Sequence, residues 1–336
     1  MTVETKSITQ KLNLAFIGLG WIGYNRMQAV LGSGLAQALY LSDTQPCTLS
    51  KISENNPYAY LCTDSQQIDY SAVDGVVIAT PSALHGKQTI DALEAGCSVF
   101  CQKPLARTAG ECREILDTAR IQDKLLGVDF SYRHLKATSL TKELLKSGDI
   151  GEIYAVDACF HNAYGPDKEW FYNPSLSGGG CVMDLGIHMV DTVLYLLDEH
   201  QVKTVSGKHF SKGKPVSNKM GIIEDHSFVQ IGLENNTNVQ IACSWNLNTG
   251  CDAVINITLF GTRGSLCIKN VNGSFYDFTL ERYRGTSKEV LLSPPDDWGG
   301  RAIVEWAQNL YEGKKYDPEG ERLYTVSQII DSIYGR

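Results

Sequence analysis

The chain has 336 residues, of which 43% are hydrophobic and 20% are charged, and its formal net charge is −8. These values are typical of a globular protein of about two domains, and they exclude a disordered or fibrous chain. The sequence has no dense run of Lys and Arg and no stretch of about 18 apolar residues. We therefore expect neither nucleic acid nor a membrane among its partners.

The N-terminal segment and the cysteines favour a cytoplasmic protein. Residues 1–11 lack the apolar core of a signal peptide. The ten cysteines form no Cys-x-x-Cys pair and no Cys/His cluster at zinc spacing. We therefore expect reduced, mostly buried thiols, no metal site and a cytoplasmic location.

Strand and helix patterns alternate in the first third of the chain. Apolar runs typical of buried strands occur at residues 12–20, 38–43, 74–80, 97–104 and 124–130. Helical patterns separate them at residues 21–34, 82–96 and 108–123. Such alternation indicates a parallel, doubly wound sheet, so we predict an α/β cofactor-binding domain in residues 1–130.

The pattern changes near residues 128–138. Helical patterns follow at 139–151 and 178–198, around a strand at 153–163. Strand patterns then run through 226–247, 252–270 and 273–285, and two helical patterns close the chain at 301–313 and 324–335. Successive strands without helices between them indicate a mostly antiparallel sheet. We predict a second α/β domain in residues 131–336 that binds substrate, and we leave open whether the C-terminal helix packs back on the first domain.

A Gly-x-Gly-x-x-Gly motif stands between the first strand and the first helix. Gly18 permits a tight turn, Gly20 lets a pyrophosphate approach the backbone, and Gly23 allows the helix to pack closely on the sheet. The helix N-terminus, at Trp21 and Ile22, offers free N–H groups and a partial positive charge. The motif in this context predicts a dinucleotide site of the Rossmann type.

Asp43 ends the second predicted strand, 20 residues after Gly23. A carboxylate at this position can accept a hydrogen bond from a ribose 2′-hydroxyl, and it would repel a 2′-phosphate. No arginine follows it closely. The sequence therefore favours NAD over NADP, unless Asp43 is an incidental strand-end residue.

Two further strand ends face the same predicted edge of the sheet, where ligands bind in open α/β folds. Thr80-Pro81 and Gln102-Lys103 follow the third and fourth predicted strands and are candidate cofactor contacts. Lys103 could also donate to a substrate oxygen, or it could be a solvated loop lysine. His85 is either a cofactor contact or a structural histidine.

The predicted helix at 178–198 carries a polar stripe on an apolar surface. Asp184, His188 and Asp191 lie at i, i+4 and i+7, so they share one face. Burying an ionisable group in a helix costs free energy, so such groups are expected to be paired or to be needed for function. His188 is suited to take a proton near neutral pH, with Asp184 orienting it or contacting substrate. The alternative is a core histidine bonded to one of the two aspartates.

Four segments together resemble the glucose-fructose oxidoreductase/inositol dehydrogenase/MocA family. They read GLGWIG (18–23), VVIATPSALH (76–85), CQKPLA (101–106) and WFYNPSLSGGGCVMDLGIHMVD (170–191). The resemblance covers nearly the whole chain. It implies a Rossmann domain followed by an α/β domain whose large open sheet joins dimers or tetramers. It also implies hydride transfer between NAD and a secondary alcohol of a sugar, cyclitol or sugar derivative.

The resemblance assigns catalytic roles to three residues. The family's catalytic lysine falls on Lys103, its acid/base histidine on His188, and its supporting aspartate on Asp184. The sequence departs from the family where Gln102 replaces the usual glutamate. It departs again at residues 170–173, which read Trp-Phe-Tyr-Asn rather than Trp-Arg-x-Asp.

Candidate substrate contacts include, besides Asp184 and His188, the residues Tyr132, Arg133, Asn162, Tyr164, Trp170 and Asn173. Each of these six could instead be structural. Two other functions remain open: an NAD-dependent glycosidase that oxidises its sugar transiently, and a non-catalytic NAD-binding regulator. Fold alone cannot choose among such chemistries.

Overall fold

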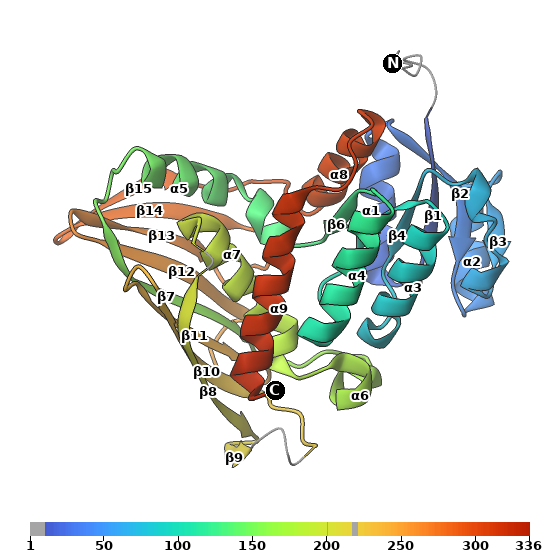
Figure 1. The fold of residues 1–336 in the computed structure, drawn as a ribbon. Helices are drawn as coiled ribbons and strands as arrows, with labels where there is room; N and C mark the ends of the chain where they lie inside the picture. Colours follow the sequence, from blue (N-terminus) through green and yellow to red (C-terminus); the bar gives the residue numbers. More distant parts are fainter. Residues whose placement is uncertain (1–10, 200, 217–220) are drawn as a thin grey trace.

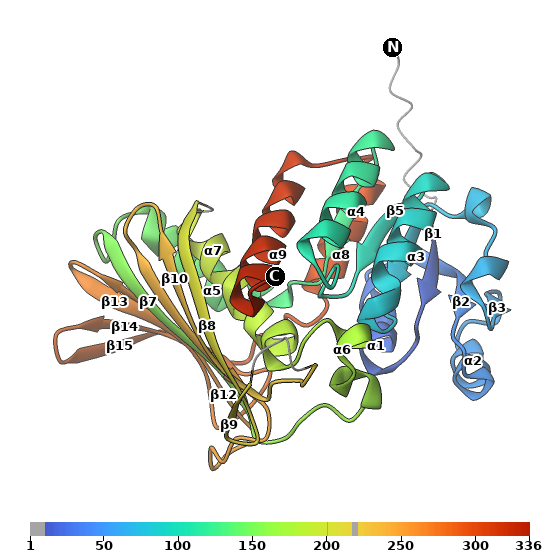
Figure 2. The same ribbon diagram turned by 60° about the horizontal axis from the view of Figure 1, so that its bottom comes forward.

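The computed structural model describes residues 11–199, 201–216 and 221–336. Two β-sheets, each with helices packed on it, lie side by side (Figures 1 and 2). Residues 1–10, in which we expect no signal peptide, lie outside the described part.

The first sheet has six strands in the order β3-β2-β1-β4-β5-β6, and all its pairs are parallel. The strands are β1 (Leu12–Ile17), β2 (Ala36–Ser42), β3 (Tyr60–Cys62), β4 (Gly75–Ile78), β5 (Ser98–Cys101) and β6 (Leu126–Val128). The predicted doubly wound sheet is confirmed. The strand order reverses between β1 and β4, which places a ligand crevice outside their carboxyl ends.

Helices cover both faces of this sheet. They are α1 (Trp21–Gly32), α2 (Pro46–Ser53), α3 (Ser82–Glu94) and α4 (Ala109–Ile121). Residues of α1 and α2 share one apolar cluster with β1, while α3 and α4 belong to the core that continues into the second sheet. Thr108 caps α4, since its hydroxyl accepts the N–H of Glu111 at 3.2 Å.

The second sheet has nine strands in the order β15-β14-β13-β12-β7-β11-β10-β8-β9. Only the pair β7–β11 is parallel among these described strands, so the predicted mostly antiparallel sheet is confirmed. The strands are β7 (Ile153–Asn162), β8 (Val202–Ser211), β9 (Lys214–Val216), β10 (His226–Leu233), β11 (Asn238–Ser244), β12 (Ala253–Gly261), β13 (Gly264–Asn270), β14 (Phe278–Arg284) and β15 (Ser287–Leu292).

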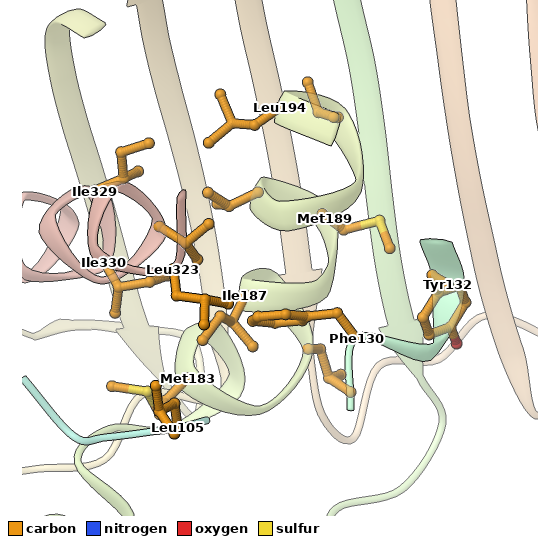
Figure 3. Packing of buried hydrophobic residues seen from close by; sticks show 14 of the residues in the cluster. Leu105, Phe130, Tyr132, Met183, Ile187, Met189, Leu194, Leu323, Ile329 and Ile330 are labelled. Carbon is orange, nitrogen blue, oxygen red and sulfur yellow. The ribbon is translucent and has the colours of Figure 1, made fainter. Parts of the chain in front are cut away.

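Three helices pack on one face of this sheet: α5 (Lys136–Lys146), α7 (Ile187–Leu197) and α9 (Glu321–Tyr334). Figure 3 shows Ile187 and Leu194 of α7 beside Leu323, Ile329 and Ile330 of α9, in front of the strands. The segment Pro174–Leu197, which includes the short α6 (Pro174–Ser177), is apolar and long enough to span a membrane, but most of it is buried here. This burial is what a core helix requires.

The helix α8 (Arg301–Tyr311) follows the second sheet in sequence but packs on the first. The ring of its Trp306 lies against two glycines of the first sheet, where a Cβ on Gly75 or on Gly127 would come within 2.7 Å of it. Trp306 also contacts Phe100 of β5, with ring centroids 5.7 Å apart. The helix α8 therefore completes the apolar core beside the first sheet.

Candidate active site

A cleft of about 1160 Å³ opens at the carboxyl ends of the first sheet's strands and reaches the second sheet's helices. This is the position expected for a ligand in a doubly wound fold. The cleft brings together most of the predicted site residues: Gly18, Gly20, Trp21, Ile22, Asp43, Thr80, Pro81, His85, Gln102, Lys103, Tyr132, Tyr164, Trp170, Asp184 and His188.

The three motif glycines have distinct surroundings. Gly18 has φ +86°, and a Cβ there would lie 2.6 Å from the Ala79 carbonyl oxygen. A Cβ on Gly23 would meet the Gly18 carbonyl at 2.0 Å, so the helix can approach the strand only because this residue is glycine. A Cβ on Gly20 would meet nothing within 4 Å. The backbone at Gly20 therefore faces open space, and α1 begins there without a side-chain cap, as an anion-binding helix N-terminus requires.

Asp43 supports the glycine loop as well as lining the cleft. Its carboxylate accepts the backbone N–H of Leu19 at 2.8 Å and that of Gln45 at 2.9 Å. A carboxylate has about four lone-pair sites, so acceptor capacity remains for a ribose hydroxyl.

His85 and Thr80 connect two loops of the cleft. The imidazole of His85 is 1% exposed, and its nitrogens lie 2.7 Å from the carbonyl oxygens of Pro104 and Thr80. Burial lowers its pKa. The hydroxyl of Thr80 donates to the side chain of Gln88 at 2.6 Å. Because both ring nitrogens of His85 already face backbone oxygens, its geometry is that of a structural residue holding the backbone beside Lys103.

Lys103 and Asp184 form an ion pair between the two halves of the molecule. The Lys103 ammonium donates to the Asp184 carboxylate and to the Asp184 backbone carbonyl, each at 2.8 Å. The other carboxylate oxygen of Asp184 accepts the indole N–H of Trp245 at 3.0 Å. Both ends of the pair are therefore fixed, and an ammonium, with three donors, keeps one for a ligand.

Asp184 lies in a π-helical turn, Val182–Gly186, that leads into α7. Such turns weaken the regular i→i+4 bonding of a helix and are frequent at functional sites. Here the Asp184 carbonyl accepts from Lys103. Gly186 packs against β11, where a Cβ would lie 3.2 Å from Cys243 Sγ.

A buried carboxylate holds the start of this turn. Glu224 is 2% exposed and accepts the N–H groups of Gly180 and Val182 at 3.0 Å, as well as the hydroxyl of Tyr334 at 2.7 Å. Side chains at Gly179 and Gly180 would collide with Tyr334 and Glu224 respectively. The glycine run thus lets the C-terminal helix and Glu224 approach the segment that carries Asp184.

His188 is buried at the deep end of the cleft. Its ring packs against Tyr132, with centroids 5.0 Å apart, and against Phe130 at 6.3 Å. Burial lowers its pKa well below the usual value, and the positive charges of Lys103 and Arg26 lower it further. The Nδ1 atom is buried without a hydrogen-bond partner among the described residues. Because Nδ1 is enclosed by protein, a substrate in the cleft would have to reach the imidazole through its other nitrogen, Nε2.

A second buried network surrounds Gln102. The guanidinium of Arg26 donates to Asp129 at 2.6 Å and to the Ser131 hydroxyl at 3.1 Å, and Ser131 donates to Asp129 at 2.6 Å. The Gln102 amide donates to the same carboxylate. The single negative charge of Asp129 thus satisfies one cation and two neutral donors.

Three predicted substrate contacts do not line the cleft. The Arg133 guanidinium forms a two-pronged ion pair with the buried Asp191. Asn162 ends β7 outside the cleft, and Asn173 caps α6 by accepting the Ser175 N–H at 3.1 Å. The three residues of the predicted polar stripe therefore have different surroundings. Asp191 pairs with Arg133, whereas Asp184 and His188 face the cleft.

Sequence reasoning missed several side chains of the site. Asp129 and Trp245 each follow a strand, so attention to every strand end would have found both as candidates. Arg26 lies in α1 with no distinguishing spacing, and Glu224 lies in a connecting segment. No local pattern could reveal partners that meet only in the folded chain.

Comparisons with known proteins match both parts of the chain to one family. Residues 12–130 match the model described as "Oxidoreductase family, NAD-binding Rossmann fold", and residues 139–267 match "GFO/IDH/MocA C-terminal domain". The chain is 35% identical to D-glucoside 3-dehydrogenase of Escherichia coli K12 over 276 residues. The aligned segment covers 78% of this chain and 76% of the relative. The chain belongs to the Gfo/Idh/MocA family. It is an oxidoreductase, and the predicted resemblance is confirmed.

Solved structures of the family share its fold. A levoglucosan dehydrogenase in complex with NADH superposes with a TM-score of 0.81 at 22% identity, over 96% of each chain. A 3-ketoreductase from Actinomadura kijaniata, in complex with NADP and TDP-benzene, superposes with a TM-score of 0.83 at 18% identity, over 96% of this chain and 97% of its own. At these identities the likeness concerns the fold alone.

We predict that Gln102→Glu, which introduces the glutamate usual in Gfo/Idh/MocA proteins, destabilises this member of the family. The change removes a donor to Asp129 and places a second carboxylate beside it. We expect a loss of about 1–3 kcal/mol in the free energy of unfolding at pH 7, measured by urea denaturation. Like charges raise the pKa of the pair, so the loss should shrink as the pH falls and one carboxyl binds a proton.

The double variant Gln102→Glu/Asp129→Asn is the matched control. It restores one carboxylate and one amide in exchanged positions, so it should recover most of the lost stability. Wild-type stability of Gln102→Glu at pH 7, or no recovery in the double variant, would contradict this account of the network.

Proposed function

We propose that the chain is an NAD-dependent dehydrogenase that reversibly oxidises a secondary hydroxyl of a sugar, cyclitol or sugar derivative. The observation that carries the proposal is the convergence of Lys103, Asp184 and His188 in one cleft with the glycine loop. The likeness to D-glucoside 3-dehydrogenase supports a sugar-type substrate.

The cofactor site fits a dinucleotide. The open backbone at Gly20 and the uncapped start of α1 would hold the pyrophosphate, and Asp43 the adenosine ribose. When bound, NAD would supply a nicotinamide ring that accepts or returns a hydride.

His188 is the proposed general base. Its lowered pKa keeps the imidazole neutral at pH 7, so a ring nitrogen that faces the cleft can take the proton of the substrate hydroxyl. That O–H bond breaks as the carbon–oxygen double bond forms, and the hydride leaves the same carbon. The remaining N–H of Lys103 donates to the substrate oxygen and stabilises its developing negative charge, while Asp184 holds the ammonium in place.

We predict that Lys103→Met and His188→Ala each lower kcat for sugar oxidation by about 10²- to 10⁴-fold. The turnover is measured as the NADH that forms from NAD while each member of a panel of inositols, aldoses and glycosides is oxidised. Lys315→Met and His134→Ala, which change the same residue types outside the cleft, are the matched controls. Because Lys103 lowers the pKa of His188, that pKa should also rise in Lys103→Met, as read by NMR of the imidazole.

Wild-type turnover in Lys103→Met or in His188→Ala would refute the catalytic role assigned to that residue. Release of an aglycone from a nitrophenyl glycoside without net formation of NADH would instead favour the transient-oxidation glycosidase. Tight NAD binding with no turnover across the panel would favour a regulator.

We further propose that NAD is preferred over NADP because the Asp43 carboxylate repels a 2′-phosphate. Asp43→Asn should lower the NAD-over-NADP ratio of kcat/KM by about tenfold, while the amide oxygen still accepts an N–H of the glycine loop. Asp43→Ala is the comparison, since it loses both the charge and the loop contact. An unchanged ratio in Asp43→Asn would show that the charge does not set the preference.

We propose that the face of the second sheet opposite α5, α7 and α9 joins two or four copies of the chain. On β10, Val229 and Ile231 belong to the core beneath the helices and are 2% and 3% exposed, whereas Phe228, which alternates to the other face, is 47% exposed. Phe228→Glu should reduce the molar mass measured by light scattering to that of a monomer, while Tyr58→Glu, far more exposed on the first domain, should not. A monomeric wild type would refute this assembly.

A further inference from the structure

Six aromatic side chains line the same cleft as His188. We name them the aromatic shelf, and they are Tyr164, Trp170, Phe171, Phe275, Tyr276 and Trp298. They come from the segment between β7 and α6, from the segment between β13 and β14, and from the residues before α8. None of them takes part in the proposed proton or hydride transfer.

Part of the shelf is open to solvent, whereas His188 and Trp298 are buried. His188 is 8% exposed and Trp298 is 6% exposed, whereas Tyr164 and Tyr276 are 51% and 53% exposed. Such open aromatic rings beside a catalytic cleft are typical of a surface that a ligand covers.

Ring contacts join members of the shelf in pairs. The centroids of Tyr164 and Phe275 lie 6.2 Å apart, and those of Tyr276 and Trp298 lie 6.4 Å apart. Trp170 stacks on Phe171 at 3.8 Å. The shelf thus presents several flat apolar faces in fixed positions, which is the arrangement that binds another flat apolar group.

The charged side chains that line the cleft favour an uncharged ligand. Among the residues that the structure describes, four cations line it, and each has a carboxylate partner. The pairs are Arg26–Asp129 and Lys87–Asp91 at 2.6 Å, Lys103–Asp184 at 2.8 Å and Lys168–Asp167 at 3.1 Å. An anionic sugar beside Lys103 would therefore have to draw the ammonium away from Asp184.

We propose that the substrate is an uncharged glycoside whose aglycone carries a flat apolar group, and that this group binds on the aromatic shelf. The sugar ring lies deep in the cleft, with the reacting hydroxyl at His188 and Lys103. The aglycone extends outward over Trp170 and Tyr276. This inference rests on the proposed sugar dehydrogenase activity and adds the chemical class of its substrate.

Matched glycosides test it by NADH formation with the wild-type enzyme. Phenyl D-glucoside should have a kcat/KM about tenfold or more above that of methyl D-glucoside in the accepted anomer, a factor equivalent to about 1.4 kcal/mol. Phenyl D-glucuronide, which differs by a carboxylate, should have a kcat/KM at least about tenfold below that of phenyl D-glucoside. Both anomers of each are assayed.

Variants locate the effect on the shelf. Trp170→Ala and Tyr276→Ala should each reduce the phenyl-over-methyl ratio of kcat/KM by about threefold or more, because each removes one ring face. Tyr58→Ala is the control, since Tyr58 is 91% exposed and lies outside the cleft. An unchanged ratio in both shelf variants would overturn the proposal.

Binding to the His188→Ala variant separates this proposal from the proposed function. Its dissociation constants for phenyl and methyl D-glucoside, measured by calorimetry with NAD present, do not depend on turnover. Tighter binding of the phenyl glucoside by about tenfold, with no NADH formed by the wild type, would keep the shelf and refute the dehydrogenase. Wild-type turnover with equal kcat/KM for both glucosides would refute the shelf and keep the dehydrogenase.

Discussion

The ion pair between Lys103 and Asp184 is the contact on which the site depends. Lys103 lies just beyond the end of β5 in the first sheet, after Gln102, and Asp184 lies in the turn before α7 under the second sheet. The pair fixes how the two halves of the cleft face each other. Since Trp245 and the glycine-rich start of the turn hold Asp184 from its own side, the ammonium meets a rigid partner. Neither half of the molecule contains the site by itself.

The apolar helix accommodates its three ionisable groups in three different ways. Asp184 neutralises Lys103, and Asp191 neutralises Arg133 deep in the core. His188 has no such charge partner in the described contacts, and burial, together with the nearby cations, keeps it neutral. A neutral base between fixed positive charges can take a proton and then favours releasing it, which suits a reversible reaction.

Much of the fold follows from local patterns. The buried strands and the glycine loop were predictable because apolar runs and Gly-x-Gly-x-x-Gly report burial and a tight turn directly. The strands β3, β8, β9 and β15 were missed because most of their residues are exposed or half-buried and carry little apolar periodicity. Arg133 was expected in the cleft, yet it pairs with Asp191, since a helix face does not specify which loop packs against it. The networks around Asp129 and Glu224 join residues far apart in sequence, so only the folded chain reveals them.

The position of α8 has a consequence for synthesis of the protein. Trp306 fills the space above Gly75 and Gly127, yet the ribosome makes it long after both strands have emerged. At typical elongation rates the growing chain exposes that face of the first sheet for roughly ten to forty seconds. Throughout this interval the nascent chain presents apolar strands to its surroundings, so it is a natural client for chaperones that bind at the exit tunnel.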